Sequence, residues 1–139
     1  MARRLIPPPD VAVEPGGEAF GMAMMVAELL RANLADSRLR ARLARRARGC
    51  VVLIASDRDL GVTIAFAEEG ITVVGEPTDP APTLAGGWLE MAAVCSGSRS
   101  PLRALAKREM HVTARRPVRL LASAGYMLKV PRSVASGDR

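Results

Sequence analysis

The segment spanning residues 86–117 constrains the fold more than any other part of this chain. Apolar residues recur at helical spacing over 88–95, so a short helix there would carry one apolar face. Ser96 and Gly97 interrupt the pattern, and Ser100-Pro101 favours a second helix, because serine caps helices and proline is tolerated in a first turn. Alternating apolar and polar residues over 110–114 then indicate a strand. The segment predicts two short apolar helices against a sheet, an arrangement that can enclose an apolar cavity.

The rest of the chain carries the same two kinds of pattern. The predicted strands are 51–56, 60–66, 71–76, 83–85 and 110–114, and the first three are joined by short turns that indicate an antiparallel meander. Further helices are predicted at 18–34, at 37–48 and from 117 onward. The apolar stripe of the first of these is predicted to comprise Phe20, Met24, Val26 or Leu30, Ala27 and Leu34, and that of the second Leu39, Leu43 and Ala47. We expect an α+β fold, with a five-stranded, mostly antiparallel sheet and helices packed on one face.

The length of 139 residues fits one domain. Residues 1–17 are expected to form a flexible arm, because Pro7 to Pro9 favour polyproline geometry and Gly16-Gly17 precedes the first helix. Residues 18–131 would form the folded domain. Residues 132–139 are small and polar and are expected to be disordered.

Composition points to an apolar but aromatic-poor core. Hydrophobic residues make up 49% of the chain, which excludes a disordered protein, whereas aromatic residues make up only 3%. A core of Ala, Leu, Val and Met offers a smooth wall that suits a lipid better than a polar substrate, although an alanine-rich composition also reflects codon bias. No apolar run approaches the roughly 18 residues of a membrane span, and a cytoplasmic location is the default expectation.

Chemistry-bearing residues are few and scattered. His111 is the only histidine and is expected to be exposed on its strand, and Asp57, Asp59 and Glu68-Glu69 are expected to lie in turns. Cys50 and Cys95 have no metal-ligand spacing and are expected to be buried free thiols, so we expect no metal and no cofactor. Since no acid–base set is visible, the chain is not expected to be an enzyme.

Six arginines fall within residues 38–48. Such a run is either a solvated helix face or a contact surface for anionic partners. Arg38, Arg42 and Arg45 are the predicted contacts to an anionic membrane surface. Nucleic acid is disfavoured, because no aromatic residues for base stacking are interleaved with the arginines. The oligomeric state is left open.

Part of the sequence resembles a known family. The motifs that carry this resemblance are Pro82-Thr83-Leu84-Ala85, Trp88-Leu89-Glu90-Met91-Ala92-Ala93-Val94-Cys95-Ser96-Gly97 and Arg99-Ser100-Pro101-Leu102-Arg103-Ala104-Leu105. The predicted strand over 110–114 follows them. Their order is similar to that of the sterol carrier protein 2 family of small lipid-binding domains, and in particular to a stand-alone bacterial member of actinobacterial type. The resemblance covers residues 18–131. It also implies the strand order and a parallel pairing among the last strands.

The resemblance implies non-catalytic binding, and by extension transfer, of a lipid, sterol or fatty acyl chain in a hydrophobic cavity. The helix over 18–34, the sheet and the helices after Gly87 would form its wall. The predicted ligand-binding residues are Phe20, Met24, Phe66, Leu84, Trp88, Met91, Cys95, Leu102, Leu105 and Met127. The alternative is a protein-interaction or regulatory module with a filled core that works beside an enzyme.

Overall fold

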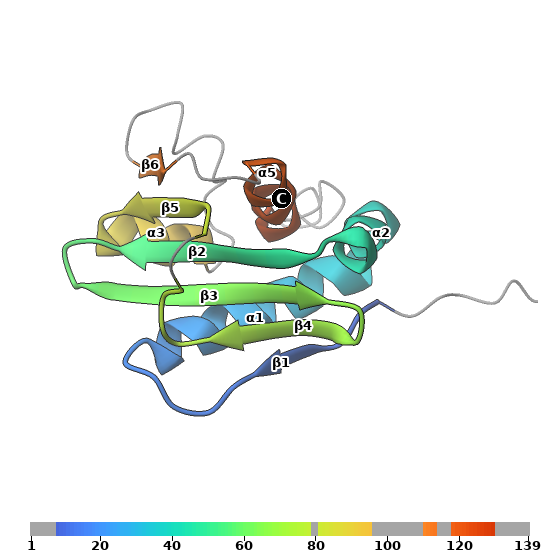
Figure 1. Cartoon of the computed structure of the whole chain (residues 1–139), viewed down its shortest axis with the longest axis horizontal. Coiled ribbons are helices and arrows are strands. Elements are labelled where there is room, and N and C mark those ends of the chain that lie inside the picture. Colours follow the sequence, from blue (N-terminus) through green and yellow to red (C-terminus); the bar gives the residue numbers. More distant parts are fainter. Residues whose placement is uncertain (1–7, 79–80, 96–109, 114–117, 130–139) are drawn as a thin grey trace, which may run out of the picture.

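The structure, a computed structural model, describes residues 8–78, 81–95, 110–113 and 118–129. Its strands are β1 (Val11–Val13), β2 (Gly49–Ala55), β3 (Leu60–Ala67), β4 (Gly70–Val74), β5 (Thr83–Gly86) and β6 (Met110–Thr113). The described helices are α1 (Phe20–Asp36), α2 (Arg38–Arg46), α3 (Trp88–Cys95) and α5 (Val118–Leu128). The strands form one six-stranded sheet in the order β1-β4-β3-β2-β5-β6 (Figure 1).

The sheet is mixed but built around the expected meander. β2 pairs with β3, and β3 with β4, in antiparallel register. The parallel pairing implied among the last strands is wrong, because β5 and β6 run antiparallel. The parallel pairs of the sheet are β2 with β5 and β1 with β4. The α+β class is therefore confirmed, with one strand more than predicted.

The additional strand, β1, corrects the prediction that residues 1–17 form a flexible arm. It pairs in parallel with β4, and Val11 is buried. Arg31 of α1 donates hydrogen bonds from Nε (3.0 Å) and Nη2 (2.7 Å) to the carbonyl of Val11. These long-range contacts order a segment whose prolines and glycines are typical of loops. Residues 1–7, the predicted helix after Ser100 and the predicted tail lie outside the described residues.

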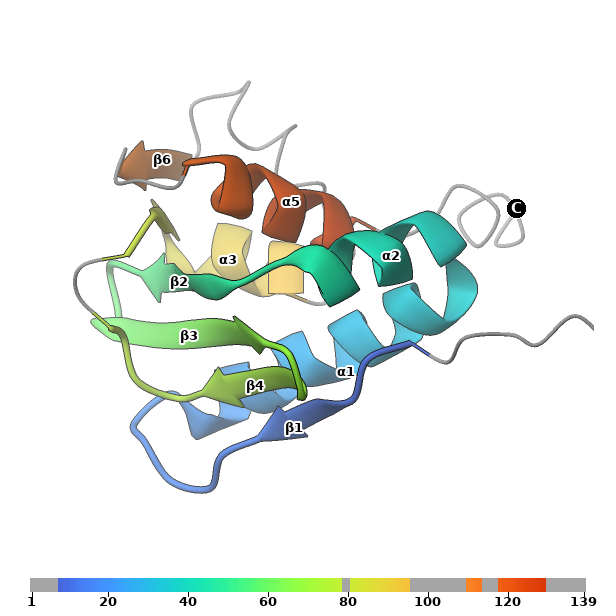
Figure 2. The same ribbon diagram turned by 45° about the vertical axis from the view of Figure 1, so that its right-hand side comes forward.

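One face of the sheet carries the core. Successive side chains of a strand point to opposite faces, so alternate residues of β2, β3 and β4 are fully buried on the helical side. These residues are Val51, Leu53, Val62, Ile64, Ile71 and Val73. Helix α1 packs on β1, β3 and β4, while α3 and α5 pack on β2 (Figure 2). Helix α2 packs on α1 and α5.

The other face is partly covered by the chain between β4 and β5. Thr63 Oγ1 donates to the carbonyl of Glu76 (2.7 Å), and a Cβ on Gly61 would lie 3.1 Å from Pro77. Thr63 is buried as a result, although it points away from the helices. This crossover explains how β5 returns to pair beside β2.

The buried stripe of α1 differs from the predicted one at its start. Val26, Ala27, Leu30 and Leu34 are buried as predicted, but Phe20 and Met24 are 36% and 48% exposed. The amide of Ala19 donates to the carbonyl of Gly75 (2.9 Å), so the start of α1 approaches β4 very closely. A Cβ on Gly75 would lie only 2.7 Å from the amide nitrogen of Phe20, so there is no room for the Phe20 side chain on that side, while Met22 takes the buried position in the first turn.

The stripe predicted for α2 is correct in part: Leu43 and Ala47 are partly buried and pack against the core cluster, whereas Leu39 does not. Leu39 is 51% exposed, and the buried residues are Arg40, Ala41 and Ala44. The hydroxyl of Ser37 accepts a hydrogen bond from the amide of Arg40 (3.2 Å) and caps the helix as expected. An arginine takes the place expected for an apolar side chain.

Arg40 is buried because it holds the end of α5. Its Nε donates to the carbonyls of Tyr126 (3.0 Å) and Lys129 (2.8 Å), and its guanidinium lies 4.1 Å from the centroid of the Tyr126 ring. The side-chain amide (Nδ2) of Asn33 donates to the carbonyl of Met127 (2.8 Å). The last carbonyls of a helix lack partners within the helix. Here α1 and α2 supply these partners.

We predict that Arg40→Ala lowers the free energy of unfolding by about 2–4 kcal/mol, because buried carbonyls lose charged donors and the ring loses its cation. Arg42→Ala, on the exposed face of the same helix, should change it by less than about 0.5 kcal/mol. Urea denaturation of both variants measures the difference. Equal stability of the two variants would contradict this role for Arg40.

Candidate apolar ligand site

The structure brings together the predicted ligand-binding residues that it describes in the strands and in α3 and α5. Phe66, Leu84, Met91 and Met127 are at most 4% exposed and belong to one core cluster between the sheet and the helices. Trp88 is partly buried and packs against the same cluster. Four of these residues are therefore part of one apolar core and Trp88 packs against it, while ligand binding by the five remains a prediction.

The other predicted residues do not join this cluster in the described structure. Phe20 and Met24 lie on the exposed face of α1. Cys95 ends α3, but its side chain, Leu102 and Leu105 lie outside the described residues. Ligand binding by any of these residues remains a prediction.

Helices α3 and α5 cover opposite ends of β2. At its carboxyl end, the amide of Ser56 donates to the carbonyl of Gly86 (2.8 Å), directly before α3. At its amino end, Leu120 of α5 lies against Gly49, where a Cβ would meet its Cδ2 at 3.0 Å. Both helices also pack on α1, but within the described structure they have little backbone contact with each other. Both helices contribute buried apolar side chains to the core cluster, among them Met91 of α3 and Met127 of α5.

The turn between β2 and β3 fixes the start of α3. The carboxylate of Asp57 accepts a hydrogen bond from the amide of Trp88 (2.7 Å), and the guanidinium of Arg58 lies 5.6 Å from the centroid of the Trp88 ring. Asp57 and Asp59 are turn residues, as predicted. The capping role of Asp57 was missed, because it acts on a residue 31 positions away. The glycine pair before Trp88 was the only local signal.

The polar candidates lie apart from this interior. His111 is exposed on β6, as expected, and Cys50 is a free thiol that is only partly buried. Glu68 and Glu69 form the turn between β3 and β4. Among the residues that the structure describes, no group of three His, Cys, Asp or Glu side chains could hold a metal ion.

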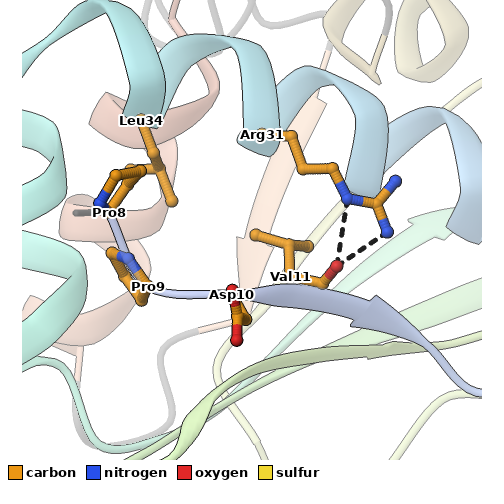
Figure 3. Close-up of a pocket in the computed structure, with 6 residues that line it drawn as sticks. All are labelled: Pro8, Pro9, Asp10, Val11, Arg31 and Leu34. Atoms are coloured by element: carbon orange, nitrogen blue, oxygen red, sulfur yellow. Dashed lines mark hydrogen bonds between the residues drawn. The ribbon is translucent and has the colours of Figure 1, made fainter.

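A hollow lies where β1 meets α1 (Figure 3). It has a volume of about 300 Å³ and is lined by Pro8, Pro9, Asp10, Val11, Arg31 and Leu34. The guanidinium of Arg31 crosses it to reach the carbonyl of Val11 and also pairs with Glu28 (2.7 Å). The lining is therefore mixed, with the apolar side chains of Pro8, Pro9, Val11 and Leu34 beside the charged Asp10 and Arg31. No predicted ligand-binding residue lines it.

The three predicted surface arginines differ in exposure. Arg38 and Arg42 are exposed on α2, whereas Arg45 is partly buried. None of the described helices is both long and apolar enough to cross a membrane.

The fold of this chain is similar to that of proteins described by reference to sterol carrier proteins. Two solved structures share it with this chain. One, described as "UbiJ-SCP2 Ubiquinone synthesis protein", superposes with a TM-score of 0.58 at 15% identity over 78% of this chain and 92% of that one. The other is a solution structure of a conserved hypothetical protein from Thermus thermophilus, whose description suggests a sterol carrier protein. It gives a TM-score of 0.50 at 16% identity over 78% of this chain and 81% of that one.

At this level of identity the likeness establishes the fold, and it confirms the resemblance seen in the sequence at that level. No protein-family model matches the chain, and a search of curated proteins also finds no match. The bacterial origin suggested by the resemblance remains a prediction.

We predict that Asp57→Ala lowers the free energy of unfolding by about 1 kcal/mol, as expected for the loss of a helix cap. The start of α3 should loosen, so the emission of Trp88, the single tryptophan of the chain, should shift toward that of a more hydrated indole. Urea denaturation and fluorescence spectra measure both effects. Asp59→Asn, in the same turn, is the control: Asp59 has a φ of 53°, which asparagine tolerates, so both the stability and the emission should remain unchanged.

Proposed function

We propose that this chain binds an apolar ligand such as a lipid, a sterol or a fatty acyl chain, without catalysis. The ligand would lie between α3 and α5, above the central residues of β2. The observation that carries the proposal is that Met91 of α3 and Met127 of α5, two side chains that can change shape, both belong to the apolar core cluster over β2. Val51 and Leu53 of β2 belong to the same cluster and are at most 1% exposed.

Methionine makes this cluster adaptable. Met91 of α3 and Met127 of α5 are both fully buried in the cluster that Val51 and Leu53 also join. Methionine is unbranched and has three rotatable side-chain bonds, so it can rearrange around a guest at low cost. The cluster can therefore open for a flexible apolar chain without the rearrangement of a strand.

The fold supports the same function. One of the two similar structures is described as a ubiquinone synthesis protein, and the description of the other suggests a sterol carrier protein. Both are similar to this chain in fold. Burial of an apolar ligand would supply the driving force, at about 25 cal/mol per Å² removed from water. Transfer of the ligand between sites would follow from reversible binding.

The second candidate is an interaction or regulatory module with a filled core. Full burial of Met91 and Met127 favours it, because a filled core needs no ligand for stability. The two candidates differ in whether the buried side chains can move aside to admit an apolar ligand.

Native mass spectrometry of freshly purified protein tests the first candidate directly. We expect a co-purifying apolar molecule, and after delipidation a saturable change of Trp88 emission on titration with a fluorescent fatty acid. The partly buried indole at the edge of the cluster should sense a ligand there. Absence of both signals would support the filled-core module instead.

A pair of matched variants tests where the ligand lies. Met91→Ala in α3 and Ile71→Ala in β4 both remove a buried side chain, so each should cost about 2–5 kcal/mol of stability. Only Met91→Ala should change the affinity for the fatty acid or the preferred ligand size, because β4 lies two strands away from β2. Equal effects of both variants on affinity would place the ligand elsewhere.

A further inference from the structure

The exposed face of α2 presents a line of cations. Arg38, Arg42 and Arg46 are spaced four residues apart, so they share one stripe of the helix that is about 12 Å long. All three are exposed. In the described part of the chain, none of the three guanidinium groups forms a hydrogen bond or an ion pair. The salt bridge found there joins Arg31 to Glu28. The fold therefore leaves these three charges available to a partner.

Helix α5 lies beside α2 and runs in the opposite direction (Figure 2). Arg40, near the start of α2, bonds to the carbonyl of Tyr126 near the end of α5. Gly49, just after α2, contacts Leu120 near the start of α5. The start of α2 therefore lies near the end of α5, and the end of α2 lies near the start of α5.

The charged residues of 118–129 are Arg119 and Lys129, and both are exposed. Residues 37–49 and 118–129 contain no Asp or Glu. We call the exposed residues Arg38, Leu39, Arg42, Arg46, Arg119 and Lys129 the α2–α5 surface. Its charge is of one sign, which attracts and orients an anionic partner over a distance of about one Debye length.

Leu39 indicates what kind of anionic partner this surface fits. It is 51% exposed, directly follows Arg38 and lies one turn before Arg42. At a bilayer, arginines contact anionic headgroups while neighbouring apolar side chains enter the interface. At a phosphate backbone in water, an exposed leucine gains little.

Two of the amino acids that read base edges, asparagine and glutamine, are scarce here. The chain contains no Gln, and its one Asn, Asn33, is buried in its contact with Met127. The aromatic ring on the two helices, Tyr126, is covered by the guanidinium of Arg40 rather than open for base stacking. Of the anionic partners, a lipid surface therefore fits best.

We propose that the α2–α5 surface docks this protein onto bilayers that contain anionic phospholipid. The arginines supply electrostatic attraction and Leu39 inserts at the interface. Docking does not depend on the proposed apolar ligand, so it is measured on delipidated protein, and its failure would leave the ligand-binding proposal standing.

Co-sedimentation with vesicles tests the docking. The full chain should bind phosphatidylcholine vesicles that contain phosphatidylglycerol, should not bind pure phosphatidylcholine vesicles, and should be released by salt. Replacing Arg38, Arg42 and Arg46 together with Gln should weaken binding on the order of 100-fold at low salt, at roughly fivefold per arginine. The melting temperature should hardly change, because exposed charges contribute little to stability.

Matched controls separate this surface from net charge and from general hydrophobicity. Arg58→Gln removes an exposed charge at the opposite end of β2 and should weaken vesicle binding less than Arg42→Gln does. Leu39→Ala should weaken binding about threefold by loss of apolar insertion. Leu89→Ala removes a leucine that is 79% exposed on α3 and should have no effect.

Three results would overturn the proposal. The first is no preference of the wild type for anionic over neutral vesicles at low salt. The second is unchanged binding by the triple arginine variant, or equal losses for Arg42→Gln and Arg58→Gln. The third is tighter binding to RNA or duplex DNA than to vesicles, lost in the triple variant and insensitive to Leu39→Ala, which would assign the surface to nucleic acid.

Discussion

The arrangement of the helical layer depends on a buried guanidinium, that of Arg40. Removing an arginine from water is costly, and the cost is recovered only where the surroundings supply several well-placed acceptors. The carboxyl end of α5 does so, because its last carbonyls lack partners in the helix and carry the negative end of the helix dipole. The bonds from Arg40 to Tyr126 and Lys129 join residues 86 and 89 positions apart. Together with Asn33, they set where α5 crosses α1, and hence how much of β2 remains to be covered by side chains.

Local patterns were sufficient to predict most of the elements. Alternation placed β2, β3 and β4 within a residue or two of their observed ends, and the short turns between them predicted the meander. The clustering of Phe66, Leu84, Met91 and Met127 also followed from apolar spacing together with the resemblance. In each case, neighbouring residues in the chain carry the relevant information.

Where prediction from the sequence was wrong, the deciding partner lies far along the chain. The exposure of Phe20 follows from the close approach of α1 to Gly75, which no pattern within α1 announces. The burial of Arg40 could not be predicted from its neighbours in the sequence, because its partner Tyr126 lies 86 positions away. β1 was hidden because three residues are too few for a pattern, and its order comes from β4 and Arg31.

The contact between Arg31 and β1 has a consequence for the sheet as a whole. An edge strand offers unpaired carbonyl and amide groups to any other strand that approaches it. At β1, the outward carbonyl of Val11 is already taken by two donors from one guanidinium. A strand that added at this edge would have to displace that guanidinium or do without the Val11 carbonyl, so a side chain partly protects this edge of the sheet. The molecule thereby lowers its own tendency to assemble edge to edge into larger sheets.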